Sequence, residues 1–144
     1  DVLVGGEESG GIAIKTHIPE RDGIWMGLTI WQCMIETGMN LTEIIDEVYA
    51  LTGSFAYQRS DLKIEETLKQ QIIKKCENKE FSSFGAFKVE RYDYFDGYKF
   101  FINENEWIMI RPSGTEPVLR TYAEATSNER AKEMLKACYD TIIG

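Results

Sequence analysis

The 144-residue sequence is poor in the residues that build metal sites and disulfide frameworks, with one histidine and three cysteines. The single histidine, His17, cannot supply the histidine pairs of a metal cluster. The cysteines, Cys33, Cys76 and Cys138, are an odd number and lie far apart, which argues against a disulfide framework or a zinc site. Because each falls in a helical pattern, we expect buried, reduced thiols in a cytoplasmic protein.

Long apolar runs and an excess of positive charge are also missing. No apolar run is long enough to cross a bilayer, and no basic-then-apolar leader opens the sequence. With 16 Lys and Arg against 24 Asp and Glu, the formal net charge is −8. A nucleic-acid surface needs a basic stripe, so we expect neither nucleic acid nor a membrane as a partner. A small anion stays compatible, since two local arginines outweigh a diffuse acidic field at short range.

The first third of the sequence predicts a β-hairpin followed by a helix. Short apolar strands at Val2–Val4 and Ile12–Ile14 flank a loop with four glycines. Asp22 is a suitable N-cap for the helix that follows, and Gly38 suits its C-terminal end. The first residue is Asp1 rather than methionine, so we expect the sequence to be a piece of a longer protein.

A second helix and a domain boundary follow. Asn40 and Glu43 have the spacing of a capping box, and apolar residues recur at helical spacing as far as Leu51. The helix ends near residue 52, and we expect two domains, 1–52 and 53–144. The apolar faces of both helices have no partner within 1–52, so we expect that part to be the less ordered one.

The pattern from residue 54 onward predicts an α+β domain. Asp96-Gly97 is a strong hairpin signal, and Ser127 is a suitable cap for a terminal helix. The predicted fold is a mostly antiparallel sheet covered by helices on one face, preceded by an αβ remnant of another domain. Strands are expected at 54–59, 87–95, 98–102, 107–110 and 118–125, and helices at 64–76 and 127–142.

The segment Arg111–Pro117, R-P-S-G-T-E-P, joins two of these strands and is rich in hydrogen-bond donors. A proline lies near each end, and Gly114 allows backbone conformations that other residues avoid. Such a loop can turn its N–H groups toward an anion. The alternative is a turn with one surface arginine, but two arginines flanking the turn favour a phosphate site. Side-chain donors come from Arg111, Ser113, Thr115 and Arg120.

The glycine-rich loop of the first hairpin carries acceptors instead. Its Glu7 and Ser9 can accept hydrogen bonds from hydroxyl groups. Taken alone, this loop is equally consistent with a hairpin whose acids are solvated. Acceptors for hydroxyls in one loop and donors for phosphate in the other together indicate a sugar phosphate.

Three motifs resemble the C-terminal motifs of the α-D-phosphohexomutases, the family of phosphoglucomutases and phosphomannomutases. They are G-E-E-S-G-G at 6–11, H-I-P-E-R-D-G at 17–23 and R-P-S-G-T-E-P at 111–117. The resemblance is specific because the motifs occur in order and span nearly the whole chain. It implies the C-terminal part of that family's third domain, followed by its whole fourth domain.

The resemblance also implies roles for individual residues. The third-domain loop contacts sugar hydroxyls in the family, which gives Glu7 and Ser9 that role. Arg21 stands where members carry a basic residue that faces the substrate. The fourth-domain loop grips the phosphate that is not being transferred, a role that falls on Arg111, Ser113, Gly114, Thr115 and Arg120.

Two features depart from the family pattern. Gly11 stands where mannose- and glucosamine-type members often carry histidine, which favours a phosphoglucomutase-like enzyme. The family's phosphoserine loop and its Asp-Gly-Asp metal loop, which holds Mg²⁺, do not occur in the sequence. We therefore expect no catalytic and no metal-binding residue in this chain, which should be inactive alone. By the resemblance, mutase activity and Mg²⁺ belong to a full-length parent with further N-terminal domains.

The leading hypothesis is thus the C-terminal fragment of a phosphohexomutase. Its parent would exchange phosphate between a phosphoserine and a hexose phosphate through a hexose bisphosphate, and the hexose could be glucose, mannose or another. An alternative is a non-catalytic sugar-phosphate-binding module. The residues encoded before Asp1 would discriminate between the two. A third hypothesis, an oligonucleotide-binding sheet, is disfavoured by the acidity of the chain.

Overall fold

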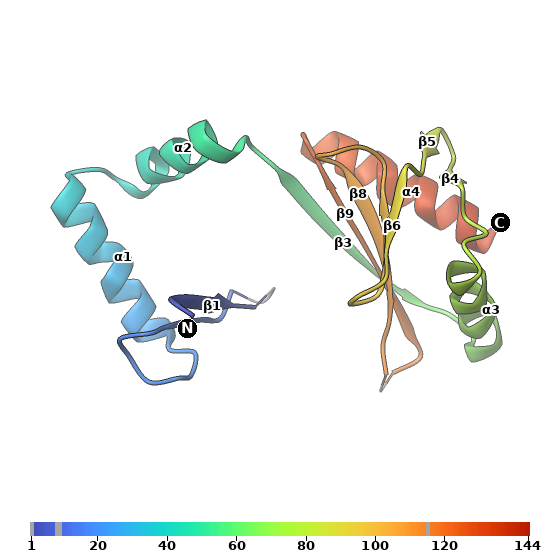
Figure 1. Cartoon of the computed structure of the whole chain (residues 1–144), viewed down its shortest axis with the longest axis horizontal. Helices are drawn as coiled ribbons and strands as arrows, with labels where there is room; N and C mark the ends of the chain where they lie inside the picture. Colours follow the sequence, from blue (N-terminus) through green and yellow to red (C-terminus); the bar gives the residue numbers. More distant parts are fainter. Residues whose placement is uncertain (1, 8–9, 115) are drawn as a thin grey trace. The chain divides into compact units, whose positions relative to one another are not determined.

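A computed structural model describes residues 2–7, 10–114 and 116–144 of the chain. The chain forms two compact units, Asp1–Gly53 and Ser54–Gly144, both drawn in Figure 1. Within the described ranges, no helix is long and apolar enough to cross a membrane.

The first unit consists of a two-stranded hairpin and two helices. Strand β1 (Val4–Gly6) pairs antiparallel with β2 (Ile12–Ile14). The first strand therefore begins two residues later than the apolar run predicts. Helices α1 (Gly23–Thr37) and α2 (Leu41–Thr52) follow.

Both helices of the first unit have the predicted caps. The Asp22 carboxylate accepts hydrogen bonds from two backbone N–H groups of the first turn of α1, both at 3.0 Å. Gly38 ends α1 with a left-handed φ of 70°. The Asn40 side chain accepts from the Glu43 N–H at 3.1 Å, and the Glu43 carboxylate accepts from the Asn40 N–H at 2.7 Å. Local sequence signals therefore set where these helices begin and end.

None of the described residues of the first unit is buried. The exposed fractions of Ile24, Trp31 and Leu51 are 81%, 62% and 89%. Cys33 is also exposed, so the prediction of a buried thiol is wrong here. The reason is that no described element of this unit covers the side of α1 on which Cys33 lies. With few buried apolar contacts, this unit has little to oppose local opening.

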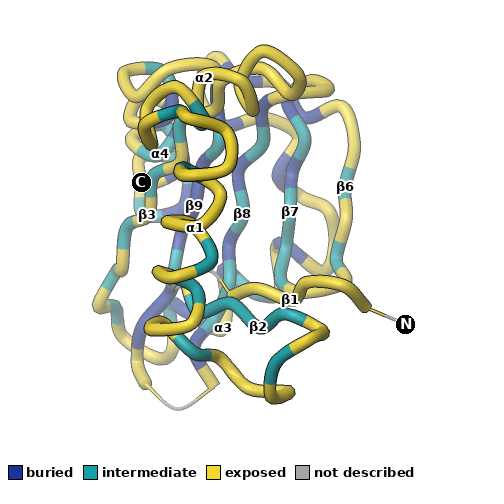
Figure 2. The backbone as a smooth tube through the Cα atoms, turned by 90° about the vertical axis from the view of Figure 1, so that its left-hand side faces the viewer, coloured by how far each residue is buried: buried dark blue, intermediate teal, exposed yellow. Residues whose placement is uncertain are grey.

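The second unit is built on a five-stranded antiparallel sheet, in the order β3–β9–β8–β7–β6 (Figure 2). Every neighbouring pair in that order runs antiparallel. The predicted α+β class with a mostly antiparallel sheet is therefore confirmed. The strands are β3 (Ala56–Lys63), β6 (Arg91–Asp93), β7 (Tyr98–Phe101), β8 (Trp107–Pro112) and β9 (Val118–Ala125).

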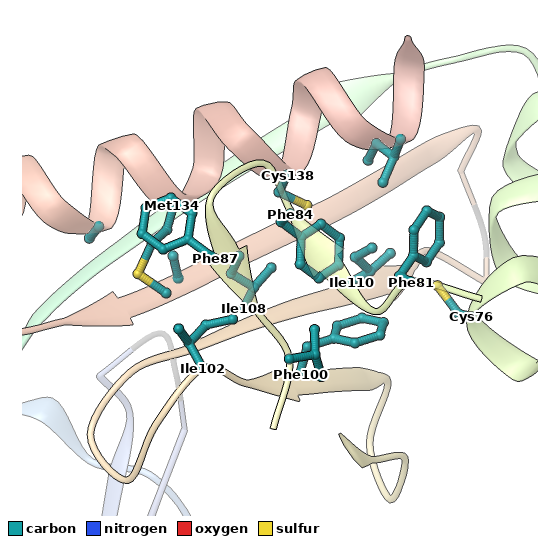
Figure 3. Packing of buried hydrophobic residues seen from close by; sticks show 14 of the residues in the cluster. Cys76, Phe81, Phe84, Phe87, Phe100, Ile102, Ile108, Ile110, Met134 and Cys138 are labelled. Carbon is teal, nitrogen blue, oxygen red and sulfur yellow. The ribbon is translucent and has the colours of Figure 1, made fainter. Parts of the chain in front are cut away.

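Helices α3 (Glu66–Glu77) and α4 (Asn128–Ile143) lie on one side of this sheet (Figure 1). A small hairpin of β4 (Ser83–Phe84) and β5 (Phe87–Lys88) lies on the same side. The hydrophobic core fills the space between these elements and the sheet (Figure 3). Its members include Ile72, Cys76, Phe84, Phe100, Ile108, Ile110, Leu119, Met134 and Cys138.

Cys76 and Cys138 lie in this core, as the sequence predicts. Burial raises the pKa of Cys76 to about 12 and also raises the pKa of Cys138. Both thiols therefore stay protonated at neutral pH, where an apolar site makes them inert.

Several predicted element bounds in the second unit are wrong. The strand expected at 87–95 is two strands, because the chain changes its pairing partner between them. The Val89 N–H donates to the Ser82 carbonyl, and the Glu90 N–H donates to the Phe101 carbonyl. Strand β3 runs past its predicted end at residue 59 because it pairs along the whole of β9, and α3 starts two residues later than expected.

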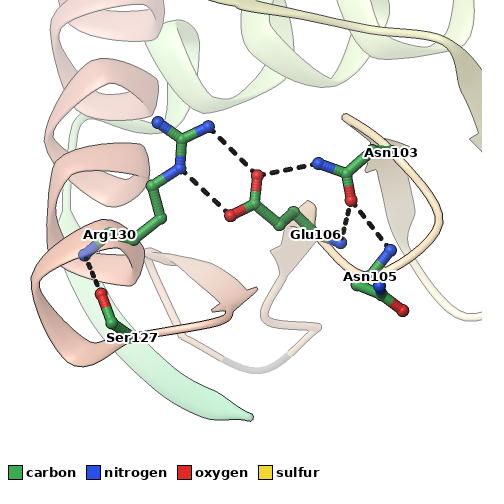
Figure 4. A network of polar contacts seen from close by, with 5 residues as sticks. All are labelled: Asn103, Asn105, Glu106, Ser127 and Arg130. Atoms are coloured by element: carbon green, nitrogen blue, oxygen red, sulfur yellow. Dashed lines mark hydrogen bonds and ion pairs between the residues drawn. The ribbon is translucent and has the colours of Figure 1, made fainter. Parts of the chain in front are cut away.

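An ion pair between a buried carboxylate and a half-exposed arginine joins α4 to the turn between β7 and β8 (Figure 4). Both carboxylate oxygens of Glu106 accept hydrogen bonds from the Arg130 guanidinium, each at 3.1 Å. The Asn103 side-chain amide also donates to Glu106, at 2.9 Å. The Glu106 side chain is only 6% exposed, so its charge depends on these donors. The hydrogen bonds from Arg130, more than any other interaction, hold the pKa of Glu106 below its usual value.

We expect Glu106→Gln to lower the free energy of unfolding by about 2 kcal/mol at pH 7, because Arg130 loses its charged partner. A carboxylate with a lowered folded-state pKa stabilises above the unfolded-state pKa, and this stability is lost as the pH falls through the folded value. The difference between the two proteins should therefore shrink below pH 4.5. Urea unfolding at pH 7 and pH 3 measures it. Glu104→Gln, at an exposed position of the same turn, should change stability by less than about 0.5 kcal/mol. Equal losses for Glu106→Gln at both pH values would contradict a role for the charge.

The amide hydrogens of α1 and α2 should exchange with solvent at least about tenfold faster than those of β8 and β9, because the two helices bury no side chain. Hydrogen exchange followed by NMR at low protein concentration measures the difference. A second measurement at tenfold higher concentration tests whether exposed apolar residues such as Trp31 drive self-association, which would slow exchange in the helices. Equal protection of both units at low concentration would refute the expectation.

Candidate functional site

The arginine-rich motif lies at one end of the sheet, where β8 turns into β9. The sequence predicts a loop from Arg111 to Pro117, but Arg111 and Pro112 are the last residues of β8. They continue the ladder, with Arg111 opposite Arg120 and Pro112 opposite Leu119. The Ser113 N–H closes the ladder by donating to the Val118 carbonyl at 3.0 Å. The connection is therefore shorter than predicted. The Ser113 N–H is used in this backbone hydrogen bond and is not a donor for an anion.

Arg111 lies on the face of the sheet opposite the core. Strand alternation places Ile110 in the core and Arg111 on the other side, where its side chain is 39% exposed. Its guanidinium lies 3.2 Å from the Asp96 carboxylate, in the β6–β7 turn. The β6–β7 turn comes close to β8 at Gly97, where an added Cβ would lie 3.3 Å from the Cβ of Arg111. The φ of Gly97 is 100°, a conformation that favours glycine. A surface cavity of about 270 Å³ adjoins these residues, lined by Tyr94, Asp96, Gly97, Tyr98, Arg111 and Pro112.

Arg120 lies beside Arg111 in the same row across the sheet. Asp61 of β3 is directly opposite it on the other side, and its guanidinium lies 3.8 Å from the Glu116 carboxylate. Its Nε is buried and, among the described residues, has no hydrogen-bond partner. Two guanidiniums side by side repel each other, so this row favours an anion between them.

The connection itself offers two backbone donors among the described residues, the N–H groups of Gly114 and Glu116. Gly114 is exposed, and no described group accepts a hydrogen bond from its N–H. Ser113 is buried. Thr115, a further predicted phosphate residue, lies outside the described residues. The structure thus places the Arg111 side chain and the Gly114 N–H, with Arg120 as the neighbouring charge, at one end of the sheet.

Lys69 of α3 is a residue that the sequence motifs do not single out, yet it lies against this connection. Its Nζ donates to the carbonyls of Ser113 at 2.9 Å and Glu116 at 3.1 Å, and it is 3.4 Å from the Glu66 carboxylate. Lys69 is only 6% exposed. A sequence signal exists, because Lys69 shares one helical stripe with the buried Ile72 and Cys76, and a buried lysine needs oxygen partners.

The glycine-rich loop of the first unit brings Glu7 and Arg21 together. The Arg21 Nη1 donates to the Glu7 carboxylate at 2.5 Å, and its Nε donates to Glu20 at 3.1 Å. Hydrogen bonds from Arg21 to Glu20, and then to Glu7, raise the pKa of Arg21 above its usual value. The Glu7 backbone is fixed as well, since its N–H donates to the Gly11 carbonyl at 2.9 Å. Ser9, the other predicted sugar-contacting residue, lies outside the described residues.

Because Gly11 has no side chain, the Glu7–Arg21 ion pair has room beside it. A Cβ at residue 11 would lie 2.7 Å from the Cδ of Arg21 and 3.4 Å from a carboxylate oxygen of Glu7. A side chain there would therefore displace Arg21 from Glu7.

His17 has a structural partner in the same unit. Its Nε2 donates to the Asp22 carboxylate at 2.8 Å, and its ring stacks on Trp25 with the ring centroids 4.6 Å apart. Asp22 is the N-cap of α1, and the backbone N–H of Trp25 and then His17 lower its pKa. His17 thus ties the loop after β2 to the first turn of α1. In the described part of the chain, no group of three or more His, Cys, Asp or Glu could hold a metal ion.

Comparisons with protein families match both parts of the chain. Residues 63–141 match the family model "Phosphoglucomutase/phosphomannomutase, C-terminal domain". Residues 1–52 match the model "Phosphoglucomutase/phosphomannomutase, alpha/beta/alpha domain III".

Similar proteins carry related names. A phosphoglucomutase/phosphomannomutase of Thermococcus kodakarensis is 31% identical over 133 residues, which is 92% of this chain and 27% of that protein. A phosphoglucosamine mutase of Methanocaldococcus jannaschii is 36% identical over 136 residues, covering 93% of this chain and 28% of that protein. A solved structure of a phosphoglucomutase/phosphomannomutase family protein from Burkholderia thailandensis shares the fold, with a TM-score of 0.66 at 16% identity over 96% of this chain and 27% of that one. The chain thus spans little more than a quarter of the length of these relatives.

Gly11→Ala should displace Arg21 from Glu7, because the added Cβ takes the space of the Arg21 side chain. We expect the Arg21 Nε–H resonance to shift in the same direction as in Glu7→Gln. The free energy of unfolding should barely change, because the ion pair is exposed. Gly5→Ala is the matched control, since no atom of the described residues lies within 4 Å of its added Cβ. An unchanged Arg21 resonance in Gly11→Ala would refute this contact.

Proposed function

The chain belongs to the phosphoglucomutase/phosphomannomutase family, and from that premise we propose that it binds a hexose phosphate through two loops. The Ser54–Gly144 unit holds a phosphate group of the ligand, and the Asp1–Gly53 unit contacts sugar hydroxyls. The observation that carries this proposal is the placement of Arg111, half-exposed beside a surface cavity at the end of the strand that leads into the Gly114 connection.

The phosphate half of the proposal rests on a comparison of magnitudes. The ion pair of Arg111 with Asp96 is exposed, and such pairs contribute at most about 1 kcal/mol. A phosphate can accept two parallel hydrogen bonds from a guanidinium, each worth about 1.5–3 kcal/mol when the groups are charged. Phosphate therefore displaces Asp96, and the Gly114 N–H and the charge of Arg120 add to its binding.

The sugar half of the proposal rests on Glu7. A carboxylate accepts hydrogen bonds and donates none, which suits it to contact sugar hydroxyls. The hydrogen bond from Arg21 fixes the direction of this carboxylate. By the family resemblance, Ser9 is a second contact in the same loop.

The activity that we propose for the whole protein is the transfer of phosphate within a hexose phosphate by way of a hexose bisphosphate. This chain's part is to hold the phosphate that is not reacting. Because a bisphosphate must present either phosphate to the same residues, recognition by charge suits the task better than recognition of the ring. Relatives named for glucose, mannose and glucosamine phosphates support the hexose phosphate class.

Magnesium belongs to the proposal only for the longer protein. The family resemblance assigns Mg²⁺ to a loop that this sequence does not contain. No step of the reaction is therefore assigned to a metal held by this chain.

Arg111→Ala should weaken the binding of glucose 1-phosphate and of inorganic phosphate by at least about tenfold, because a bidentate charged contact is lost. Arg111→Lys should recover only part of the affinity, since an ammonium group cannot reproduce the planar fork. Melting temperatures should barely change, because the Arg111 side chain lies outside the core. NMR or calorimetric titrations, with thermal melts alongside, measure both effects.

Arg91→Ala provides the control, because it removes the same charge from an exposed position of the same sheet. It should leave phosphate affinity within about twofold of the wild type, since an exposed charge at a distance is screened. Equal affinities of the wild type and both Arg111 variants would rule out the phosphate site.

A further inference from the structure

We propose that Lys69 is a positioning residue for anion binding, which holds two loop carbonyls so that the Gly114 N–H is presented on the Arg111 side. This inference rests on the proposed function, because it assigns a further residue to the same phosphate site. It adds a residue from α3 that contacts no ligand itself.

The contacts of Lys69 bracket the connection between β8 and β9. Its Nζ holds the carbonyl of Ser113, the first residue after β8, and the carbonyl of Glu116, two residues before β9. The Lys69 side chain is 7% exposed. A lysine buried to that degree is unusual and requires oxygen partners. Here two of its partners are loop carbonyls, so the ammonium group fixes the backbone of the loop.

Because the peptide bond is planar, fixing the Ser113 carbonyl also fixes the direction of the Gly114 N–H. In a trans peptide the carbonyl and the following N–H point to opposite sides. The Ser113 carbonyl points to Lys69, so the Gly114 N–H points away from it. Helix α3 packs on the core side of the sheet, whereas Arg111 lies on the other face. The Gly114 N–H is therefore turned toward the side on which Arg111 lies.

The charge of Lys69 also favours anion binding by the Gly114 N–H. An ammonium group bound to a carbonyl polarises that peptide, and the hydrogen on the far side becomes a stronger donor. The Glu116 carbonyl also accepts from the Val118 N–H at 2.7 Å. Lys69 thereby connects the loop to the first hydrogen bonds of the β8–β9 ladder. The surroundings of Gly114 are open, since no described atom lies within 4 Å of a Cβ built there, and the exposed peptide is accessible to an anion.

The test is a titration of inorganic phosphate into the full chain, followed by NMR of the Gly114 amide and the Arg111 Nε–H. The test variants are Lys69→Gln, which keeps a neutral N–H donor group, and Lys69→Met, which keeps none. Lys74→Met removes the same charge from an exposed position of α3. Ile72→Val destabilises the same helix without touching the loop. If Lys69→Met does not fold, the titration of Lys69→Gln alone tests the inference.

In the wild type, phosphate should shift both resonances. In the Lys69 variants we expect affinity to fall by about tenfold, the ratio that one hydrogen bond to a charged group supplies. The Gly114 response should disappear while the Arg111 response remains, and both controls should bind like the wild type.

Three results would overturn the inference. A Lys69 variant with wild-type affinity and a wild-type Gly114 response would refute it while leaving the phosphate site standing. An equal loss in Ile72→Val would show that Lys69 acts only through stability. A wild-type chain that binds no phosphate would refute the proposed function, and this inference with it.

Discussion

Strand β9 is paired along its length on both sides, with β3 and with β8. Antiparallel register fixes which residues lie opposite one another, so it places Arg120 between Asp61 and Arg111. Strand alternation sends Leu119 and Ala123 into the core and leaves Arg120 on the other face. A slip of one residue would exchange the two faces and bury the arginines. Burial of the apolar face of the sheet therefore fixes the register, and the register places Arg111 and Arg120 side by side on the opposite face.

Local signals predict much of this fold, while features that depend on a distant partner escape prediction. The caps at Asp22, Gly38 and Asn40 were predictable, because each acts within one helical turn. The split of the strand expected at 87–95 was not, because it depends on a change of pairing partner. The contact of Lys69 with the connection is still harder to predict from the sequence, because 44 residues separate Lys69 from Ser113. Motifs identify Arg111, Glu7 and Arg21, but the sequence does not show which acidic residue each arginine meets.

Those acidic partners matter for a chain with a formal net charge of −8. Arg111 meets Asp96, Arg120 meets Glu116, and Arg21 meets Glu7 and Glu20, all as exposed or half-exposed pairs. Exposed pairs of this kind orient the arginines but contribute little binding energy. A phosphate can compete with them, because it accepts two parallel hydrogen bonds and carries more charge. The Glu106–Arg130 pair is the contrast, since its buried carboxylate is bidentate and belongs to the fold.

The two halves of the proposed binding function differ in how firmly their residues are held. Arg111 and Gly114 are attached to a sheet with a filled core, and the connection is anchored from behind by Lys69. Glu7 and Arg21 belong to a unit without buried residues among those described, and they are fixed by their mutual ion pair and by the bond from the Glu7 N–H to Gly11. A rigid phosphate site and a softer hydroxyl site suit the proposed reaction, in which a bisphosphate would turn around. Charge recognition is the same for either end of that ligand, whereas the hydroxyl contacts have to change, and the softer site is the one that can follow them.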